Sequence, residues 1–314
     1  MTEPAIETTG LTRNYGSLVA VDNLNLRVQR NTIHGFLGPN GAGKSTTIKM
    51  LVGLLRPTRG SAMVLGREVK GDDPRARQRV GFMPELPRLP KHLKATEVLD
   101  VYGRMCGIDE QERRTEIPRL IKLVGLKGRE EDLIGKYSKG MQQRIGIAQA
   151  LLGNPELVIL DEPSIGLDPV GMVEVRELMK GISKEGRTVF LSSHLLFEVE
   201  QVCSYVTIIN KGTALVSDTM ENVLHKVKGP VTLHIEVAEL TGRIVDSLRG
   251  LPFVTDIAVE GNRLILTIGT DEDVRSQISK IINGSGGTIV SMSQTGKSLE
   301  DVFVQLVGTS QEGN

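Results

Sequence analysis

The pattern of apolar and polar residues over roughly the first 220 positions predicts a mixed α/β domain. Three short apolar runs, Ile33–Leu37, Leu157–Leu160 and Thr188–Leu191, predict buried strands. Residues 45–55, directly after the first run, have the spacing of a helix. Apolar strands that alternate with helical stretches are typical of a parallel sheet covered by helices.

The pattern changes between about residues 90 and 150, where strand signals fade. Residues 96–104 and 111–124 instead carry apolar side chains at helical spacing. This change predicts a helical subdomain inserted in the α/β core.

A second domain is predicted after the pair Gly229-Pro230, which marks a boundary between residues 1–228 and 229–314. Beyond it, strands and helices are predicted in the order β-α-β-β-α-β, with Gly261-Asn262 as a hairpin turn. The segments are 231–237, 244–248, 253–259, 264–268, 274–282 and 288–292. This order is that of a small α+β domain of the ferredoxin-like type.

The end of the chain predicts one more helix. Ser298 followed by Asp301 is typical of a helix start. The apolar stripe after it requires a partner surface, in this chain or in another copy. The stripe consists of Leu299, Val302, Phe303, Leu306 and Val307.

Composition narrows the functional classes. The 314 residues are 39% hydrophobic and 24% charged, and 38 basic residues balance 38 acidic ones. The chain therefore has no overall excess of positive charge that would indicate binding to nucleic acid. The start of the chain has no signal-peptide pattern, and no apolar run reaches the ~18 residues of a membrane helix. We expect a soluble chain that serves a membrane only through a partner, and its two separated cysteines fit a reducing cytosol.

The segment Gly38-Pro-Asn-Gly-Ala-Gly-Lys-Ser45 fits the phosphate-binding P-loop pattern and lies between a predicted strand and a predicted helix. Its glycines let backbone N–H groups approach phosphate oxygens, and the helix N-terminus favours negative charge. In this chemistry Lys44 reaches the β- and γ-phosphates of a nucleotide, and the Ser45 hydroxyl binds Mg²⁺.

A second part of the predicted site follows the strand Leu157–Leu160. Asp161 ends this strand at the sheet edge, where it can assist in binding Mg²⁺. Glu162, next in sequence, is a candidate to polarise the attacking water, a form of catalysis worth about 10²–10⁴-fold in rate. A strand that ends in two carboxylates is common by itself, so the interpretation depends on the P-loop beside it.

The segment Tyr137-Ser-Lys-Gly-Met-Gln-Gln-Arg144 separates this chain from other P-loop proteins. It resembles the signature motif of ATP-binding cassette (ABC) ATPases, whose common form is Leu-Ser-Gly-Gly-Gln. Lys139 and Met141 depart from that form, while Ser138 and Gly140 keep it. The variant is familiar among export-type subunits. In chemical terms, a hydroxyl and N–H groups at a helix N-terminus can bind a γ-phosphate.

Other positions match the family in order over roughly residues 5–220. Tyr15 resembles the residue that stacks on adenine, and Ser164–Asp168 the D-loop at the dimer interface. Glu85 stands where a Gln usually senses Mg²⁺, which puts its metal role in question. His194 resembles the switch histidine at the γ-phosphate.

The resemblance thus implies an ABC nucleotide-binding domain with ATP and Mg²⁺ as its cofactors. The catalytic residues are Glu162 and His194, and the metal residues are Ser45, Glu85 and Asp161. The implied nucleotide contacts are Tyr15, Gly38, Asn40, Gly41, Gly43, Lys44, Ser45, Thr46, Ser138, Gly140, Met141 and Asp168.

The family also implies partners. The chain has one P-loop and one signature motif, and in the family each ATP is bound between the P-loop of one copy and the signature of the other. We therefore expect a head-to-tail homodimer beneath a separately encoded transmembrane permease, on the cytoplasmic face of the membrane. The C-terminal portion resembles that of drug, lipid and cofactor-related exporters. It would stabilise the dimer or bind an accessory protein.

Other functions stay open at this stage. One is a soluble ABC ATPase that acts on DNA or ribosomes, although the chain has neither a sustained heptad run nor a second cassette. Another is a module that binds ATP without hydrolysis, which Glu162 and His194 argue against. Import instead of export is also open, and the transported substrate is not encoded in this chain.

Overall fold

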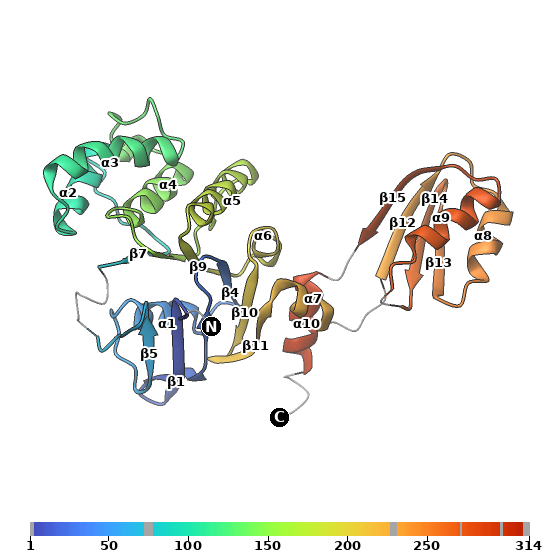
Figure 1. Cartoon of the computed structure of the whole chain (residues 1–314), viewed down its shortest axis with the longest axis horizontal. Helices are drawn as coiled ribbons and strands as arrows, with labels where there is room; N and C mark the ends of the chain where they lie inside the picture. The colour runs from blue at the N-terminus through green and yellow to red at the C-terminus, as the bar shows by residue number, and fades with distance from the viewer. Residues whose placement is uncertain (1–2, 72–77, 227–230, 271, 296–297, 310–314) are drawn as a thin grey trace. The chain divides into compact units, whose positions relative to one another are not determined.

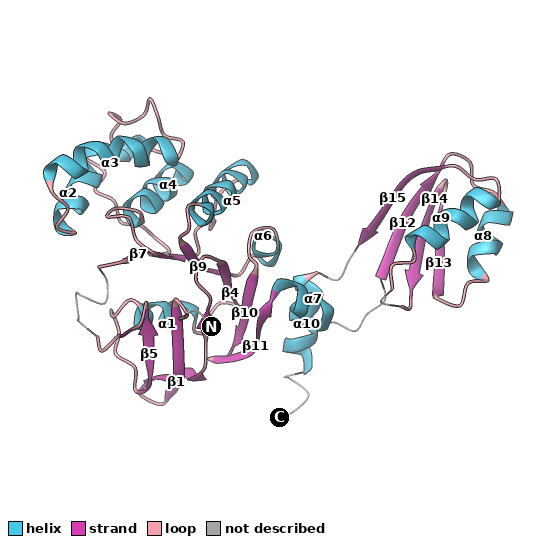
Figure 2. Ribbon diagram, viewed as in Figure 1, coloured by secondary structure: helices cyan, strands magenta, loops and turns pink. Residues whose placement is uncertain are grey.

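The computed structural model describes residues 3–71, 78–226, 231–270, 272–295 and 298–309, so the predicted boundary at Gly229-Pro230 lies outside the described residues. The chain divides into two compact units. The first comprises Met1–Val223 with Leu306–Asn314, and the second comprises Leu224–Gln305. Figure 1 follows the chain through both units, and Figure 2 distinguishes their helices and strands.

A parallel sheet forms the centre of the first unit. Its strand order is β11-β10-β4-β9-β8-β7, and only β11 runs antiparallel to its neighbour. The strands are β4 (Ile33–Leu37), β7 (Val80–Met83), β8 (Leu157–Asp161), β9 (Thr188–Ser193), β10 (Tyr205–Asn210) and β11 (Thr213–Thr219). The three predicted apolar strands are confirmed as β4, β8 and β9, and every residue of these strands is buried.

An antiparallel sheet, which the apolar pattern did not predict, lies beside it in the first unit (Figure 1). Its order is β2-β1-β5-β6, with β3 also paired to β1. The strands are β1 (Ile6–Tyr15), β2 (Leu18–Leu24), β3 (Arg27–Val28), β5 (Arg59–Val64) and β6 (Arg67–Glu68). Ile6 and Leu11 of β1 share one buried core with Phe36 of β4 and Phe190 of β9, so the two sheets pack as one domain.

Helix α1 (Lys44–Leu51) follows β4, and the prediction that it continues to Leu55 is wrong. The helix stops because Gly53 adopts a left-handed backbone with φ of 70°. The N–H of Gly53 then donates to the Met50 carbonyl at 3.1 Å, and that of Leu54 to the Lys49 carbonyl at 2.8 Å. These two bonds satisfy the last carbonyls of the helix and end it.

Helices occupy the chain between β7 and β8, as the sequence predicts. They are α2 (Ala95–Met105), α3 (Glu110–Leu123), the short 3₁₀ helix η2 (Ile134–Lys136) and α4 (Lys139–Ala150). Asp109 caps α3 by accepting a hydrogen bond from the N–H of Glu112 at 2.9 Å. After β8 come α5 (Pro169–Lys184), α6 (Leu196–Glu200) and α7 (Met220–Lys226).

The second unit has the predicted order β-α-β-β-α-β. Its elements are β12 (Val231–Val237), α8 (Gly242–Arg249), β13 (Val254–Glu260), β14 (Arg263–Ile268), α9 (Arg275–Gly284) and β15 (Ile289–Thr295). The sheet is antiparallel with the order β13-β14-β12-β15, and Gly261-Asn262 forms the predicted hairpin turn. Leu233, Ile244, Leu266 and Ile278 belong to a core of its own.

Helix α10 (Leu299–Thr309) begins as Ser298 predicts. The Ser298 hydroxyl accepts the N–H of Asp301 at 3.2 Å, and the Asp301 carboxylate accepts the N–H of Ser298 at 2.9 Å. This reciprocal pair is a capping box. Of the apolar stripe, Leu299 is fully buried.

Candidate active site

Glycine at position 43 allows the turn between β4 and α1. Gly43 has a φ of 104°, and a Cβ there would lie 2.5 Å from the carbonyl oxygen of Ala20. Gly43 is also the N-cap of α1 and offers no side chain to the first N–H groups of the helix. Those donors are therefore left for a ligand, at the positive end of the helix dipole. This arrangement suits an anion such as phosphate.

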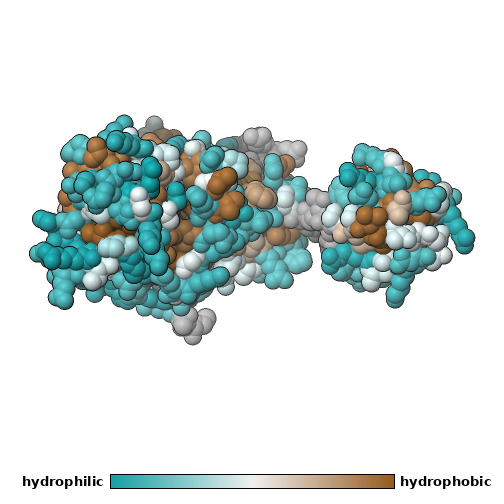
Figure 3. All heavy atoms as spheres, turned by 90° about the horizontal axis from the view of Figure 1, so that it is seen from above, coloured by the Kyte–Doolittle hydropathy of each residue, from teal (hydrophilic) through white to brown (hydrophobic). Residues whose placement is uncertain are grey.

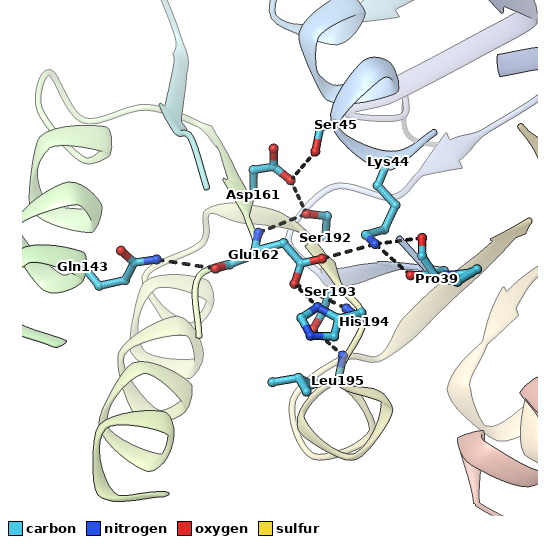
Figure 4. Close-up of polar contacts among 11 residues, drawn as sticks. Pro39, Lys44, Ser45, Gln143, Asp161, Glu162, Ser192, Ser193, His194 and Leu195 are labelled. Carbon is cyan, nitrogen blue, oxygen red and sulfur yellow. Dashed lines mark hydrogen bonds and ion pairs between the residues drawn. The ribbon is translucent and has the colours of Figure 1, made fainter. Parts of the chain in front are cut away.

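Lys44 lies in the first turn of α1 and is only 6% exposed. Its ammonium donates to the carbonyl oxygens of Gly38 at 2.7 Å and Pro39 at 3.3 Å. It also forms an ion pair with the carboxylate of Glu162 at 3.2 Å (Figure 4). The P-loop lysine and the carboxylate after β8 are thus in direct contact, which the order of the motifs in the sequence did not predict.

Glu162 is held in an unusual conformation. Its φ is 51°, a left-handed value that costs a non-glycine residue about 1–2 kcal/mol. Hydrogen bonds from its N–H to the hydroxyl of Ser192 at 3.0 Å and from the Gln143 side chain to its carbonyl at 3.4 Å hold it there. Backbone strain of this kind concentrates at functional sites.

His194 meets the other oxygen of the same carboxylate. Its Nδ1 lies 2.8 Å from Oε2 of Glu162, and its backbone N–H donates to that oxygen at 3.4 Å. Figure 4 draws the Glu162 carboxylate between Lys44 and His194. The His194 side chain is 34% exposed, while that of Glu162 is 7% exposed. An imidazole oriented through Nδ1 can present its other nitrogen to a substrate.

The Asp161 carboxylate lies at the sheet edge close to the hydroxyl oxygens of Ser45 and Ser192. Oδ1 of Asp161 accepts the hydroxyl of Ser192 at 2.5 Å and that of Ser45 at 3.4 Å. Sequence reasoning did not assign Ser192 a role, although its place at the end of a buried strand and two residues before His194 is a usable signal. Among the described residues, no group of three or more His, Cys, Asp or Glu could hold a metal ion.

A cavity of about 460 Å³ opens above the P-loop. Its lining includes seven of the predicted nucleotide contacts, together with the predicted metal residue Glu85 and the predicted catalytic residue Glu162. The seven are Tyr15, Asn40, Gly41, Gly43, Lys44, Ser45 and Thr46. Tyr15 is 44% exposed, and the guanidinium of Arg13 lies 4.8 Å from its ring centroid. Pro39 and Ile165, which lie inside the predicted P-loop and D-loop without an assigned role, also line the cavity, as do Leu18 and Ala20, which the sequence did not single out.

The remaining predicted contacts lie elsewhere. Ser138 is the N-cap of α4, where its hydroxyl accepts the N–H of Met141 at 3.2 Å. Asp168 is the N-cap of α5 and accepts the N–H of Gly171 at 2.9 Å. Within the described part of the chain, neither these two residues nor Gly140 and Met141 line the P-loop cavity.

Comparison with known proteins identifies the family to which this chain belongs. Residues 21–165 match the family described as ABC transporter. The bacitracin transport ATP-binding protein BcrA of Bacillus licheniformis is 36% identical over 304 residues, which cover 96% of this chain and 97% of that protein. The chain belongs to the ATP-binding subunits of ABC transporters. It binds and hydrolyses ATP, and the resemblance seen in its motifs is confirmed.

Two further matches agree with this ABC assignment. The Nod factor export ATP-binding protein I of Cupriavidus metallidurans is 32% identical over 296 residues, or 94% of each chain. A solved ATP-binding subunit of an ABC transporter is 30% identical with a TM-score of 0.64, and covers 71% of this chain and 92% of that one. Across the described residues of this ABC subunit, no helix is long and apolar enough to cross a membrane.

Figure 3 shows a face on which hydrophobic residues lie in small groups among hydrophilic ones.

Proposed function

We propose that this ABC subunit drives export through a separately encoded membrane protein, on whose cytoplasmic side it works. The observation that carries the proposal is the contact of the Glu162 carboxylate with Lys44 and His194 at the edge of the parallel sheet, in which Lys44 and Glu162 are buried and His194 is partly exposed. Transport is supported by the relative named for bacitracin transport, and export by the relative named for Nod factor export. Both are named as transport proteins, which favours a membrane partner over action on nucleic acid or ribosomes.

The site residues have the following proposed roles. Tyr15 stacks on adenine, and the backbone of Gly38–Gly43 with Asn40 and Thr46 surrounds the phosphates. Lys44 moves from the Glu162 carboxylate to the phosphates when ATP binds. Glu162 then accepts a hydrogen bond from the attacking water, and His194 donates one to the γ-phosphate.

Mg²⁺ fits the residues at the sheet edge. The Ser45 hydroxyl and the Asp161 carboxylate offer oxygen donors 3.4 Å apart, and Mg²⁺ prefers oxygen ligands from a few side chains together with substrate phosphates. We propose that these two residues hold it. Bound Mg²⁺ offsets negative charge on the phosphates. Glu85 lines the same cavity, and we propose that it senses this region without being a required ligand.

A second copy completes the site in this proposal. Ser138, Gly140, Met141 and Asp168 do not line the cavity of their own chain, yet the signature helix α4 begins with a hydroxyl and N–H donors suited to phosphate. A head-to-tail pair would set the signature of each copy against the ATP of the other. Loss of the γ-phosphate on hydrolysis then removes those contacts and lets the pair open.

The domains have proposed roles as well. We propose an ABC domain over residues 1–228, with its helical subdomain at about 90–150 facing the membrane protein, and a ferredoxin-like domain from residue 229 onward. The β-α-β-β-α-β order and the sheet order β13-β14-β12-β15 support the ferredoxin-like description. This domain stabilises the dimer or binds an accessory protein.

Sedimentation of the full chain tests the dimer. The Glu162→Gln variant with ATP and Mg²⁺ should sediment as a dimer with two bound ATP, because it binds ATP without removing the γ-phosphate. Adding Ser138→Arg should keep the variant monomeric while one ATP remains bound. A Glu162→Gln protein that stays monomeric when saturated with ATP would contradict the proposed head-to-tail site.

A further inference from the structure

Helix α6 begins two residues after His194, with Leu195 as its N-cap, and is only five residues long. Helices this short are not stable by themselves, since nucleation is unfavourable and few backbone bonds form. The position of α6, and of His194 just before its N-cap, must therefore come from contacts with other elements.

One contact fixes α6 on the parallel sheet. Val199 is 1% exposed and packs over Gly35 of β4. A Cβ at position 35 would lie 2.4 Å from Cγ1 of Val199, so glycine is needed for the helix to lie this close. This contact holds one point of α6 against β4 and does not by itself fix the direction of the helix.

A second contact fixes α6 on α5. Nη2 of Arg176 donates to Oε1 of Glu198 at 3.0 Å, and the two side chains are 16% and 12% exposed. The Nε of Arg176 and Oε2 of Glu198 are buried and have no hydrogen-bond partner among the described residues. The orientation of each side chain therefore depends on the other, because a charge-assisted hydrogen bond between largely buried groups is strong and directional.

This ion pair connects two segments of the site. Arg176 belongs to the helix that Asp168 caps, directly after the predicted D-loop. Glu198 is the third residue of α6 and lies four residues after His194 in the chain, with the extended N-cap Leu195 between His194 and the helix. Together, the apolar contact and the ion pair determine where α6 starts.

We propose that Arg176 and Glu198 are positioning residues that hold His194 against Glu162. Neither residue touches ATP in this account, which rests on the proposed role of His194 at the γ-phosphate. Loss of the pair lets α6 pivot on Val199, so the His194 imidazole leaves the geometry given by its 2.8 Å contact with Glu162. ATP binding through Lys44 and the P-loop is unaffected.

ATP turnover by the full chain tests the proposal. Arg176→Gln and Glu198→Gln should each lower kcat about tenfold with little change in KM, because a small displacement of a reacting group costs up to ~10²-fold. The double exchange Arg176→Glu with Glu198→Arg should restore most of the rate. In a His194→Ala background the same substitutions should cause no further loss. Arg30→Gln, which removes an ion pair with Glu156 at 3.1 Å, is the matched control.

A direct readout avoids dependence on turnover. The chain has five histidines, so selective labelling allows the His194 imidazole signal to be followed by NMR. Arg176→Gln and Glu198→Gln should shift that signal, and Arg30→Gln should leave it in place. An unchanged signal, or an equal loss of rate with and without His194, would overturn the positioning role while leaving the ATPase assignment intact. Wild-type turnover by His194→Ala would instead remove the proposed role of His194 itself.

Discussion

Nζ of Lys44 lies 3.2 Å from Oε1 of Glu162, and both side chains are more than nine-tenths buried. The residue assigned to the phosphates and the residue assigned to the attacking water therefore neutralise each other within the chain. Because burial strengthens such a pair, ATP must compete with Glu162 for Lys44. Lys44 therefore releases the Glu162 carboxylate when it binds the phosphates of ATP.

Removing the charge of Glu162 should separate binding from hydrolysis. Glu162→Gln should lower ATP turnover at least about 10²-fold, since general-base assistance is lost. It should also tighten ATP binding about tenfold, because Lys44 no longer has a carboxylate partner; tenfold corresponds to about 1.4 kcal/mol. Calorimetry and phosphate release measure the two effects. Unchanged hydrolysis would remove Glu162 from its assigned role, and weaker ATP binding would contradict the competition.

Removing Lys44 should affect binding and stability together. Lys44→Ala should weaken ATP binding at least about 10²-fold, and it leaves the buried Glu162 carboxylate without its cation, a loss of about 3 kcal/mol or more. Thermal unfolding should therefore show a lower Tm even without nucleotide. Lys49→Ala, which removes an exposed lysine from the same helix, is the control and should retain both properties. A Lys44→Ala protein with wild-type Tm would show that the ion pair contributes nothing to the fold.

Substitution of two P-loop glycines should distinguish the cost of backbone strain from the cost of a steric clash. Gly41→Ala and Gly43→Ala both place a Cβ on a left-handed residue, with φ of 81° and 104°. A Cβ at Gly41 meets nothing within 4 Å, whereas one at Gly43 lies 2.5 Å from the Ala20 carbonyl. Gly41→Ala should cost about 1–2 kcal/mol of folding stability, and Gly43→Ala clearly more. Equal denaturation midpoints for the two variants would contradict the close contact.

Acid should destabilise the first unit through His34. Burial lowers the pKa of this imidazole from 6.5 to about 3, and its Nε2 pairs with the Thr207 hydroxyl at 2.8 Å. Between these pH values the unfolded chain binds a proton that the folded chain does not. Stability is therefore full above pH 6.5 and falls by up to about 1.4 kcal/mol per pH unit as the pH drops toward 3.

Urea unfolding of wild type and His34→Gln at pH 7 and pH 5 measures this contribution. The variant should lose less stability between the two pH values than wild type does. The same loss in both proteins would mean that His34 is not the group responsible.

The sequence predicted the parts of the fold whose side chains are uniformly apolar or strictly periodic. Strand Ile33–Leu37 is buried along its whole length and is identified by its apolar run. Strand Ile6–Tyr15 mixes threonines, a glycine and an arginine with its apolar residues, because only part of it faces the core, and it was missed. The apolar spacing of helix α1 continued past its true end because the left-handed turn at Gly53 depends on backbone conformation rather than on hydrophobicity.

In the candidate site, too, some features could be predicted from the sequence and others could not. Motif order placed Lys44, Asp161, Glu162 and His194 in one family of functions, since each motif has its own sequence pattern. The contacts among them depend on neighbouring strands β8 and β9, which bring Ser192 beside Asp161. The strained φ of Glu162 and the bridging role of Ser192 have no signature in the sequence.

The proposed function requires that this ABC subunit drive a separate membrane protein. The most direct test is purification from native membranes, with this chain as bait and with the co-purifying proteins identified and quantified. We expect a polytopic membrane protein in near-equal amount, retained through purification in mild detergent. Recovery of only ribosomal, DNA-bound or other non-membrane partners would contradict the claim, and the ATPase assignment would remain.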